Sequence, residues 1–206
     1  SFGYQVLGFG GSGTAAVSAN DNGIFGYGYP NTTITNLISN LGVVATDVSG
    51  VGTARSAPSA CEYGGDKGIF GFGNASPFSA VTNLVSNIGV VATDVSGVGT
   101  ARYKLSGCDY GTDTAIFGFG ASTTPVLNMT NLVSNTGVVA TDTTGVGTAR
   151  WSQGACEFGG DKAIFAFGST PSVTNLSNLV SNVGVVATDT AGVGTSRASL
   201  AAMEYG

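Results

Sequence analysis

Histidine is absent from this 206-residue chain, and charged residues make up only 9% of it. Ordinary domains carry about 25% charged residues. Without histidine, the chain lacks the side chain that most often transfers protons at neutral pH. The seven lysines and arginines are scattered and the net charge is −5. Nucleic acids and anionic membranes both attract clustered basic residues, so we expect neither as a partner.

Cysteine and long apolar runs are also scarce. Cys61, Cys108 and Cys156 occupy equivalent positions of a repeat, and Met203 fills the fourth such position. Equivalent side chains point the same way, so we expect small buried thiols instead of disulfides or a metal ring, and no cofactor. No run approaches the roughly 20 apolar residues of a membrane span. Residues 1–4 lack the features of a signal peptide, so a leader was either removed or never present.

What the chain does contain is the phrase Gly-Val-Val-Ala-Thr-Asp, four times over. Its copies end at Asp47, Asp94, Asp142 and Asp189, which are 47, 48 and 47 residues apart. A fixed period of this size is typical of solenoids, propellers and arrays, whose units must stack to bury a core. We therefore expect a single domain, 1–206. It comprises N-terminal closing or capping strands in 1–19 and repeat units at 20–63, 64–110, 111–158 and 159–206.

Each unit reads as four short strands. In the first strand, at 23–28 in the first unit, aromatic residues alternate with glycine. The spacing of Phe70 and Phe72 predicts both rings on one face, with another ring or backbone close to the glycine on the opposite face. The second strand, at 34–39, mixes polar and apolar residues, and the third, at 43–47, is β-branched.

The fourth strand is dominated by small side chains, and it indicates the architecture. Because only small groups fit where strands converge on an axis, we expect this strand to be innermost. Short strands, frequent turns and the 47-residue period predict an all-β fold, a β-propeller of four-stranded antiparallel blades. The four copies lie at 59–63, 106–110, 154–158 and 201–205.

The order of these features resembles a Kelch repeat. Arg150 precedes the small-residue strand, Phe158-Gly159-Gly160 follows it, and Asp161-Lys-Ala-Ile-Phe165 then leads to glycine. The chain departs from the Kelch pattern in lacking a tryptophan near the end of the third strand and a Gly-Gly doublet after the aromatic strand. It also loosely resembles repeat arrays of bacteriophage structural proteins. The Kelch likeness implies four-stranded blades on a scaffold that mostly serves binding.

The number of blades is left open by the sequence. Four units give four blades if 198–205 completes the sheet begun by 23–28. Alternatively, 14–20 supplies the inner strand of the first blade, and the two chain ends form a reduced fifth blade. The terminal strands could also pair between subunits, which makes a homo-oligomer possible.

The acidic residues fall on three positions of the repeat, with none left over for an asymmetric catalytic site, so we do not expect an enzyme. One set, which we call the third acidic set because it comes last in each repeat, forms with the arginines either a ring of ion pairs between blades or a polar ring for a ligand. The members are Arg55, Arg102, Arg150, Arg197, Glu62, Asp109, Glu157 and Glu204.

A second acidic set opens the loop Asp-x-x-Gly-x-Gly, as in Asp142 to Gly147. This loop could bind calcium, but a single carboxylate favours a structural turn in which the aspartate accepts backbone N–H groups. The members are Asp47, Asp94, Asp142 and Asp189.

Two functions fit this pattern. In the first, the chain is a non-enzymatic binding or adhesion module outside a cell or on a virion, with repeated shallow sites for glycans. In the second, it is a structural building block of a fibre or virion, joined to another structural protein or to its own copies through its terminal strands.

Overall fold

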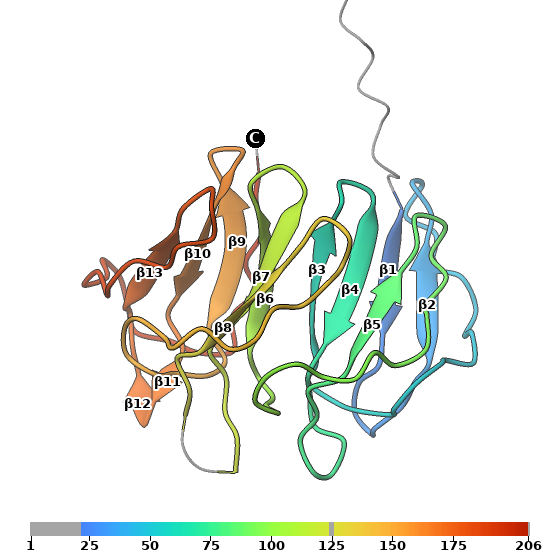
Figure 1. The fold of residues 1–206 in the computed structure, drawn as a ribbon, viewed down its shortest axis with the longest axis horizontal. Coiled ribbons are helices and arrows are strands. Elements are labelled where there is room, and N and C mark those ends of the chain that lie inside the picture. The colour runs from blue at the N-terminus through green and yellow to red at the C-terminus, as the bar shows by residue number, and fades with distance from the viewer. Residues whose placement is uncertain (1–21, 124–125, 206) are drawn as a thin grey trace, which may run out of the picture.

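The computed structural model describes residues 22–123 and 126–205, and this part of the chain contains antiparallel sheets and no helix. Four sheets follow one another along the chain, and Figure 1 shows them side by side. The all-β class predicted from the sequence is therefore confirmed. The strands expected at 4–10 and 14–18 lie outside the described residues.

The first sheet has two strands and each later sheet has three. Sheet 1 consists of β1 (Gly23–Gly26) and β2 (Thr35–Ile38); sheet 2 of β3 (Ser59–Tyr63), β4 (Lys67–Gly71) and β5 (Thr82–Val85); sheet 3 of β6 (Ser106–Tyr110), β7 (Thr114–Gly118) and β8 (Thr130–Val133); and sheet 4 of β9 (Gly154–Phe158), β10 (Lys162–Ala166) and β13 (Ser177–Val180). A small hairpin, β11 (Ser169–Thr170) with β12 (Ser172–Val173), extends from sheet 4.

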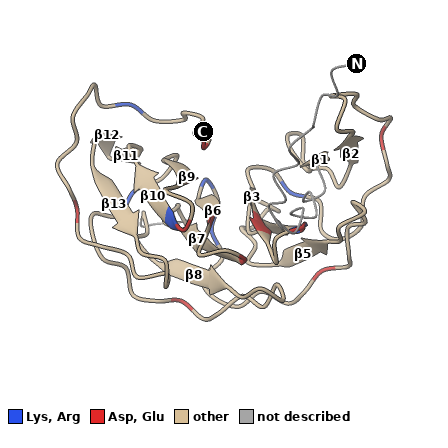
Figure 2. Cartoon of the chain, turned by 90° about the horizontal axis from the view of Figure 1, so that it is seen from above, with Lys and Arg blue, Asp and Glu red and all other residues tan. Residues whose placement is uncertain are grey.

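The small-residue strand at the end of each repeat pairs with the first strand of the next repeat. β3 pairs with β4 so that Cys61 lies opposite Ile69, and β6 and β9 use the same register with β7 and β10. These three strands also pack against one another: a Cβ at Gly107 would lie 3.1 Å from Ser59 Oγ. Small side chains therefore permit close approach along the inner side of an open arc, which Figure 2 shows from above.

The third strand expected in each unit does not form a regular strand. Its residues make only isolated antiparallel bridges to the preceding strand, at Val44 and Val48 in the first unit and at Val91 and Val95 in the second. The segment lies at the outer edge of its sheet, where much of it is exposed. β-Branched residues alone therefore do not produce a fourth regular strand here, because such residues need neighbours to pack against.

The last copy of the inner strand also differs from the prediction. Residues 201–205 form no strand and do not complete the sheet begun by β1; instead they lie beside β9, where a Cβ at Gly154 would be 3.2 Å from Ala202 Cβ. Ser199 N donates to Ser152 O at 2.8 Å, as Ser152 N does to Lys104 O. The segment therefore continues the inner row without a second strand of its own.

Phenylalanine rings fill the spaces between sheets. Phe117 of β7 packs on Gly71 of β4, where an added Cβ would lie 2.9 Å from its Cζ, so the expected close approach at this glycine is confirmed. The prediction that Phe70 and Phe72 share a face is wrong. β4 ends at Gly71 and Phe72 takes a φ of 62°, so Phe70 meets Tyr27 of the preceding repeat and Phe72 meets Phe117 of the next sheet.

Candidate functional site

A buried arginine joins each sheet to the next. The Arg102 side chain is fully buried, with its guanidinium 4.1 Å from the centre of the Phe72 ring. Its Nη2 donates to Asn131 Oδ1 at 2.6 Å and its Nε to the Phe119 carbonyl at 2.9 Å. Burial lowers the pKa of Arg102 to about 10, so it stays charged at neutral pH. Arg55 and Arg150 are equally buried and stack on Tyr27 and Phe119.

The aspartate of the repeated phrase completes this joint. Asp142 accepts hydrogen bonds from Thr100 Oγ1 at 2.7 Å, from Thr100 N at 2.8 Å and from Asn131 Nδ2 at 3.0 Å. Arg102 Nη1 lies 3.6 Å from its Oδ1. Burial by itself raises the pKa of Asp142, but these donors outweigh burial and hold the pKa below its ordinary value. We call the set of Thr, Arg, Asn and Asp the interunit clamp.

The clamp recurs at two other joints of the arc. Asp94 accepts hydrogen bonds from Thr53 and Asn83, and Asp189 accepts them from Thr148 and Asn178. Each of these threonines belongs to the preceding repeat, about 41 residues earlier. The structural role expected for the aspartates is therefore played between units, and the expectation that they accept N–H groups of their own turn is corrected for Asp94, Asp142 and Asp189. Asp47 accepts a hydrogen bond from Asn36.

The predicted ring of arginines with the third acidic set does not form. The ion pairs join Arg102 to Asp142 and Arg150 to Asp189, members of the other acidic set. The physical reason is that the arginine side chain turns toward the next unit, where Asn131 and Asp142 hold Arg102, whereas the acids line a separate cavity. The predicted ring consists of Arg55 and Glu62, Arg102 and Asp109, Arg150 and Glu157, and Arg197 and Glu204.

The clamp asparagine was not identified from the sequence. Asn83, Asn131 and Asn178 are fully buried in β5, β8 and β13, and each donates to a main-chain carbonyl of the outer segment as well as to an aspartate. A signal was present, because Asn stands between Thr or Ser and Leu at this point in all four repeats. A polar residue kept in a buried position needs a partner.

The third acidic set lines a cavity of ≈ 270 Å³ at the upper ends of the inner strands. Glu62, Asp109 and Glu157 surround it together with Tyr63 and Tyr110. Burial, a hydrogen bond shared with Asp109 and the neighbouring negative charges raise the pKa of Glu157 to about 7. Burial and the Asp109 charge also raise the pKa of Glu62. The carboxyl groups therefore crowd one another without a compensating arginine.

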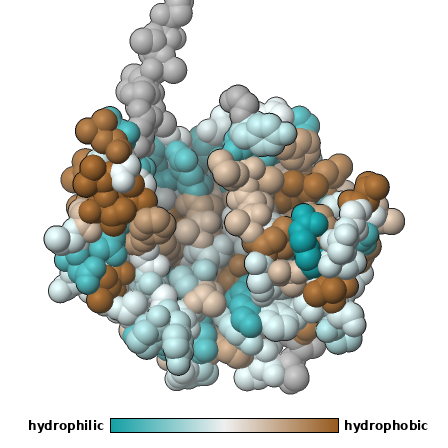
Figure 3. Space-filling model, turned by 180° about the vertical axis from the view of Figure 1, so that it is seen from behind, coloured by the Kyte–Doolittle hydropathy of each residue, from teal (hydrophilic) through white to brown (hydrophobic). Residues whose placement is uncertain are grey.

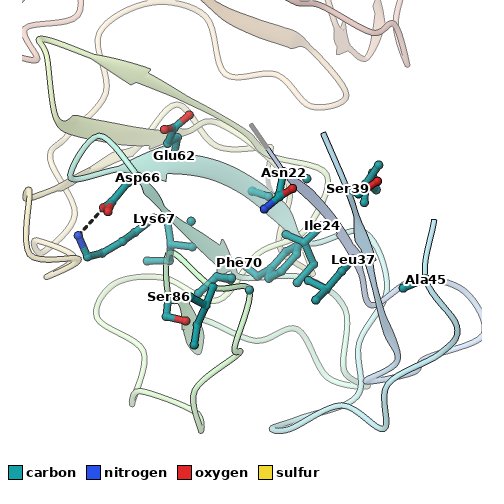
Figure 4. Close-up of a pocket in the computed structure, with 18 of the residues that line it drawn as sticks. Asn22, Ile24, Leu37, Ser39, Ala45, Glu62, Asp66, Lys67, Phe70 and Ser86 are labelled. Atoms are coloured by element: carbon teal, nitrogen blue, oxygen red, sulfur yellow. Dashed lines mark hydrogen bonds and ion pairs between the residues drawn. The ribbon is translucent and has the colours of Figure 1, made fainter. Parts of the chain in front are cut away.

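A larger cavity of ≈ 660 Å³ lies between sheets 1 and 2. Figure 4 shows Ile24 and Leu37 of sheet 1 on one side and Phe70 of β4 on another, with Glu62 and the ion-paired Asp66 and Lys67 nearby. Most of the lining is apolar.

At the other joints an aromatic ring from the inner strand occupies this place. Tyr110 of β6 lies against Leu132 and Gly184, where an added Cβ would be 2.8 Å from its Oη. Tyr63 of β3 lies in the same way against Leu84 and Gly137. Gly89 and Leu37 are the equivalent pair at the first joint, and no ring of the described residues lies between them. Within the described part of the chain, the large cavity thus lies where the other joints hold an inner-strand tyrosine.

Metal and redox sites are not evident in the described part of the chain. Residues 22–123 and 126–205 hold no group of three or more His, Cys, Asp or Glu side chains placed to bind a metal. Cys61, Cys108 and Cys156 are free, and burial raises the pKa of each thiol. Nor do these residues form any helix long and apolar enough to cross a membrane.

Comparison with known proteins gives no relative for this chain: its sequence matches no protein-family model and no curated protein.

Proposed function

We propose that the protein is a non-enzymatic structural building block, part of a β-propeller with four-stranded blades, whose copies join end to end in a fibre or on a virion. The observation that supports this most directly is the exposure of one ring. Phe25 is 60% exposed, whereas its equivalents Phe70, Phe117 and Phe165 are 5%, 0% and 0% exposed because each packs on the preceding sheet.

Phe25 is not the only exposed apolar side chain of the first repeat. Tyr29, Leu41 and Val43 are also exposed in the first repeat. Figure 3 shows brown, hydrophobic atoms concentrated at the left-hand end of the molecule, where sheet 1 lies. Contiguous apolar surface on a polar protein is typical of a protein interaction site.

The test is the mass of the protein in solution against its concentration, by light scattering or sedimentation. We expect mass to rise with concentration, and Phe25→Ser to abolish the rise. Val138→Ser removes an equally exposed apolar side chain from the third repeat and serves as the matched control. A wild-type chain that stays monomeric up to millimolar concentration contradicts the proposal.

A second function, glycan binding outside a cell or on a virion, is favoured by the smaller cavity. Its carboxylates accept hydrogen bonds from sugar hydroxyls, and Tyr63 and Tyr110 offer ring surface beside them. We expect a glycan array to yield ligands whose binding heat, by calorimetry, disappears in Asp109→Asn and persists in Asp66→Asn. An array without any bound glycan contradicts this second function.

A further inference from the structure

Among the described residues, sheet 1 lacks the inner strand that sheets 2, 3 and 4 have. In sheets 2, 3 and 4, β4, β7 and β10 each have a partner strand on both sides. Among the described residues β1 pairs only with β2, so no described strand lies along its other edge. Beside that edge lies the space between Leu37 and Gly89, which we call the slot. A strand added along this edge would pair with the backbone of β1, and an aromatic residue at its end would fill the slot.

Residues 201–205 have the sequence of such an inner strand, but no described strand pairs with them as β4 pairs with β3. Ala-Ala-Met-Glu-Tyr aligns with Ser-Ala-Cys-Glu-Tyr of β3, so Tyr205 corresponds to Tyr63. The segment lies in the inner row beside β9, yet all five of its residues are exposed, with Tyr205 at 91%. Tyr63, in contrast, is buried.

The polar groups at the two ends of the arc complement each other in the same register. Arg197 is exposed over the Phe167 ring, 3.7 Å from its centre, and its Nη1 donates to the Thr195 carbonyl at 3.2 Å. Asp47, also exposed, stands at the opposite end of the arc. Thr195 and Arg197 are the first half of an interunit clamp, and Asp47 with Asn36 is the second half.

We infer that residues 201–205 of one copy form the missing strand of sheet 1 in a second copy, with the Tyr205 ring in the slot between Leu37 and Gly89. The inference rests on the proposed function, because it describes how two copies join. A second copy is the occupant because residues 201–205 of the same copy lie against β9, away from β1 (Figure 2). The joint continues the interface that already connects sheets 2, 3 and 4.

The repeat fixes the register of this joint. Cys61 lies opposite Ile69 in sheet 2, so Met203 of one copy lies opposite Ile24 of the other. Phe25 then packs on β10 of the first copy, and Asp47 accepts hydrogen bonds from Thr195. One contact differs from the interior joints: β10 has Ala166 where β1, β4 and β7 have glycine. At Gly118 an added Cβ would lie 2.7 Å from the Phe165 ring, so Phe25 must shift at the joint.

Disulfide cross-linking tests the register between chains. In a background of Cys61→Ala, Cys108→Ala and Cys156→Ala, a tagged Met203→Cys chain is mixed with an untagged Ile24→Cys chain and treated with oxidised glutathione. Directly opposed strand residues lie about 4.5–5.5 Å apart, within the reach of a disulfide. We expect a mixed dimer that reducing agent separates. Tyr29→Cys replaces Ile24→Cys as the control and should give no mixed dimer.

A second variant tests the tyrosine without altering the fold of the separate chain. Tyr205 is exposed in one copy, so Tyr205→Ser should leave thermal unfolding of dilute protein unchanged. Loss of its buried ring should weaken association roughly 10- to 100-fold, measured by sedimentation. Val138→Ser removes an exposed apolar side chain of the third repeat and should associate like wild type.

The outcomes separate this inference from the proposed function. The chains could associate although no mixed dimer forms and Tyr205→Ser has no effect. This result would overturn the pairing of residues 201–205 with β1 of a second copy, but it would leave end-to-end joining intact. A disulfide formed only inside a chain carrying both cysteines shows closure within one copy and also overturns it. Absence of association at every concentration overturns both.

Discussion

The joint between sheets 3 and 4 and the joint between sheets 1 and 2 are built from the same repeat, yet one is filled and the other hollow. At the filled joint Tyr110 lies between Leu132 and Gly184. At the hollow joint Leu37 and Gly89 hold the same places and ≈ 660 Å³ of space opens beside them. The clamp residues Arg55, Asn83 and Asp94 are present at the hollow joint. The ring therefore decides whether the space closes, and the clamp forms without it.

The largest effect should come from removing a ring at a filled joint. Phe117→Ala leaves a void between two sheets and should lower the free energy of unfolding by about 3–5 kcal/mol. Phe25→Ala, at the same position of the first repeat, should change it by less than about 1 kcal/mol in dilute protein, because Phe25 is exposed. Urea denaturation measures both. Equal losses would show that the first repeat is packed like the third.

Tyr110→Ala would turn the filled joint into a copy of the hollow one. Because Tyr110 is buried, we expect a loss of about 3 kcal/mol in urea denaturation. Tyr205→Ala is the matched control and should stay within about 0.5 kcal/mol of wild type. A loss below about 1 kcal/mol for Tyr110→Ala would mean that the ring does not support the joint.

Removing a clamp carboxylate should cost less than removing a ring. Asp142→Ala leaves Asn131 and Arg102 without a charged partner, and we expect a loss of about 2 kcal/mol. Asp47→Ala touches only the exposed hydrogen bond from Asn36, and the change should be within about 0.5 kcal/mol. Comparable losses for the two variants would contradict the distinction between complete and half clamps.

The smallest effect concerns Glu157 and pH. Its pKa is about 7 in the folded chain and near 4.5 when unfolded, so the folded state holds the proton more tightly. This stabilises the fold below about pH 4.5 and is lost as the pH rises through about 7. Because the carboxyl group is still partly solvent-accessible, screening limits the change to about 1 kcal/mol or less. Glu157→Gln should remove the slope in denaturation curves measured from pH 5 to 8, and an unchanged slope would exclude Glu157 as its source.

The clamp aspartates have the opposite effect on how stability depends on pH. The folded-state pKa values of Asp94, Asp142 and Asp189 are below the ordinary value of 3.8. Their contribution is therefore complete above about pH 4 and is lost on further acidification. Together with Glu157, they place the maximum of stability near pH 4–5.

The strands that the sequence predicts well are those that local pattern determines. Aromatic residues alternating with glycine, and the small-residue segments, became β4 with β3 and their equivalents because both sides of these strands are packed. The regular strand predicted from Val43 onward does not form, because this outer segment lies at the edge of its sheet, where β-branched residues have few neighbours.

The candidate site was harder to predict because its partners come from different repeats. The carboxylate of Asp94 and the hydroxyl of Thr53 are 41 residues apart, and no local pattern shows that they meet. The predicted pair of Arg55 with Glu62 does not form, because Arg55 donates to Asn83 of the next repeat instead. The cavity depends on the ring missing at a single joint, which only the spatial arrangement reveals.

Ala166 would make the proposed joint between copies weaker than the joints inside one copy. Inside one copy, glycine lets each ring seat fully on its neighbour, whereas the methyl group of Ala166 holds the incoming ring away at the coupling between copies. A filament made of such copies would bend, and under tension would part, at its couplings before any individual copy came apart.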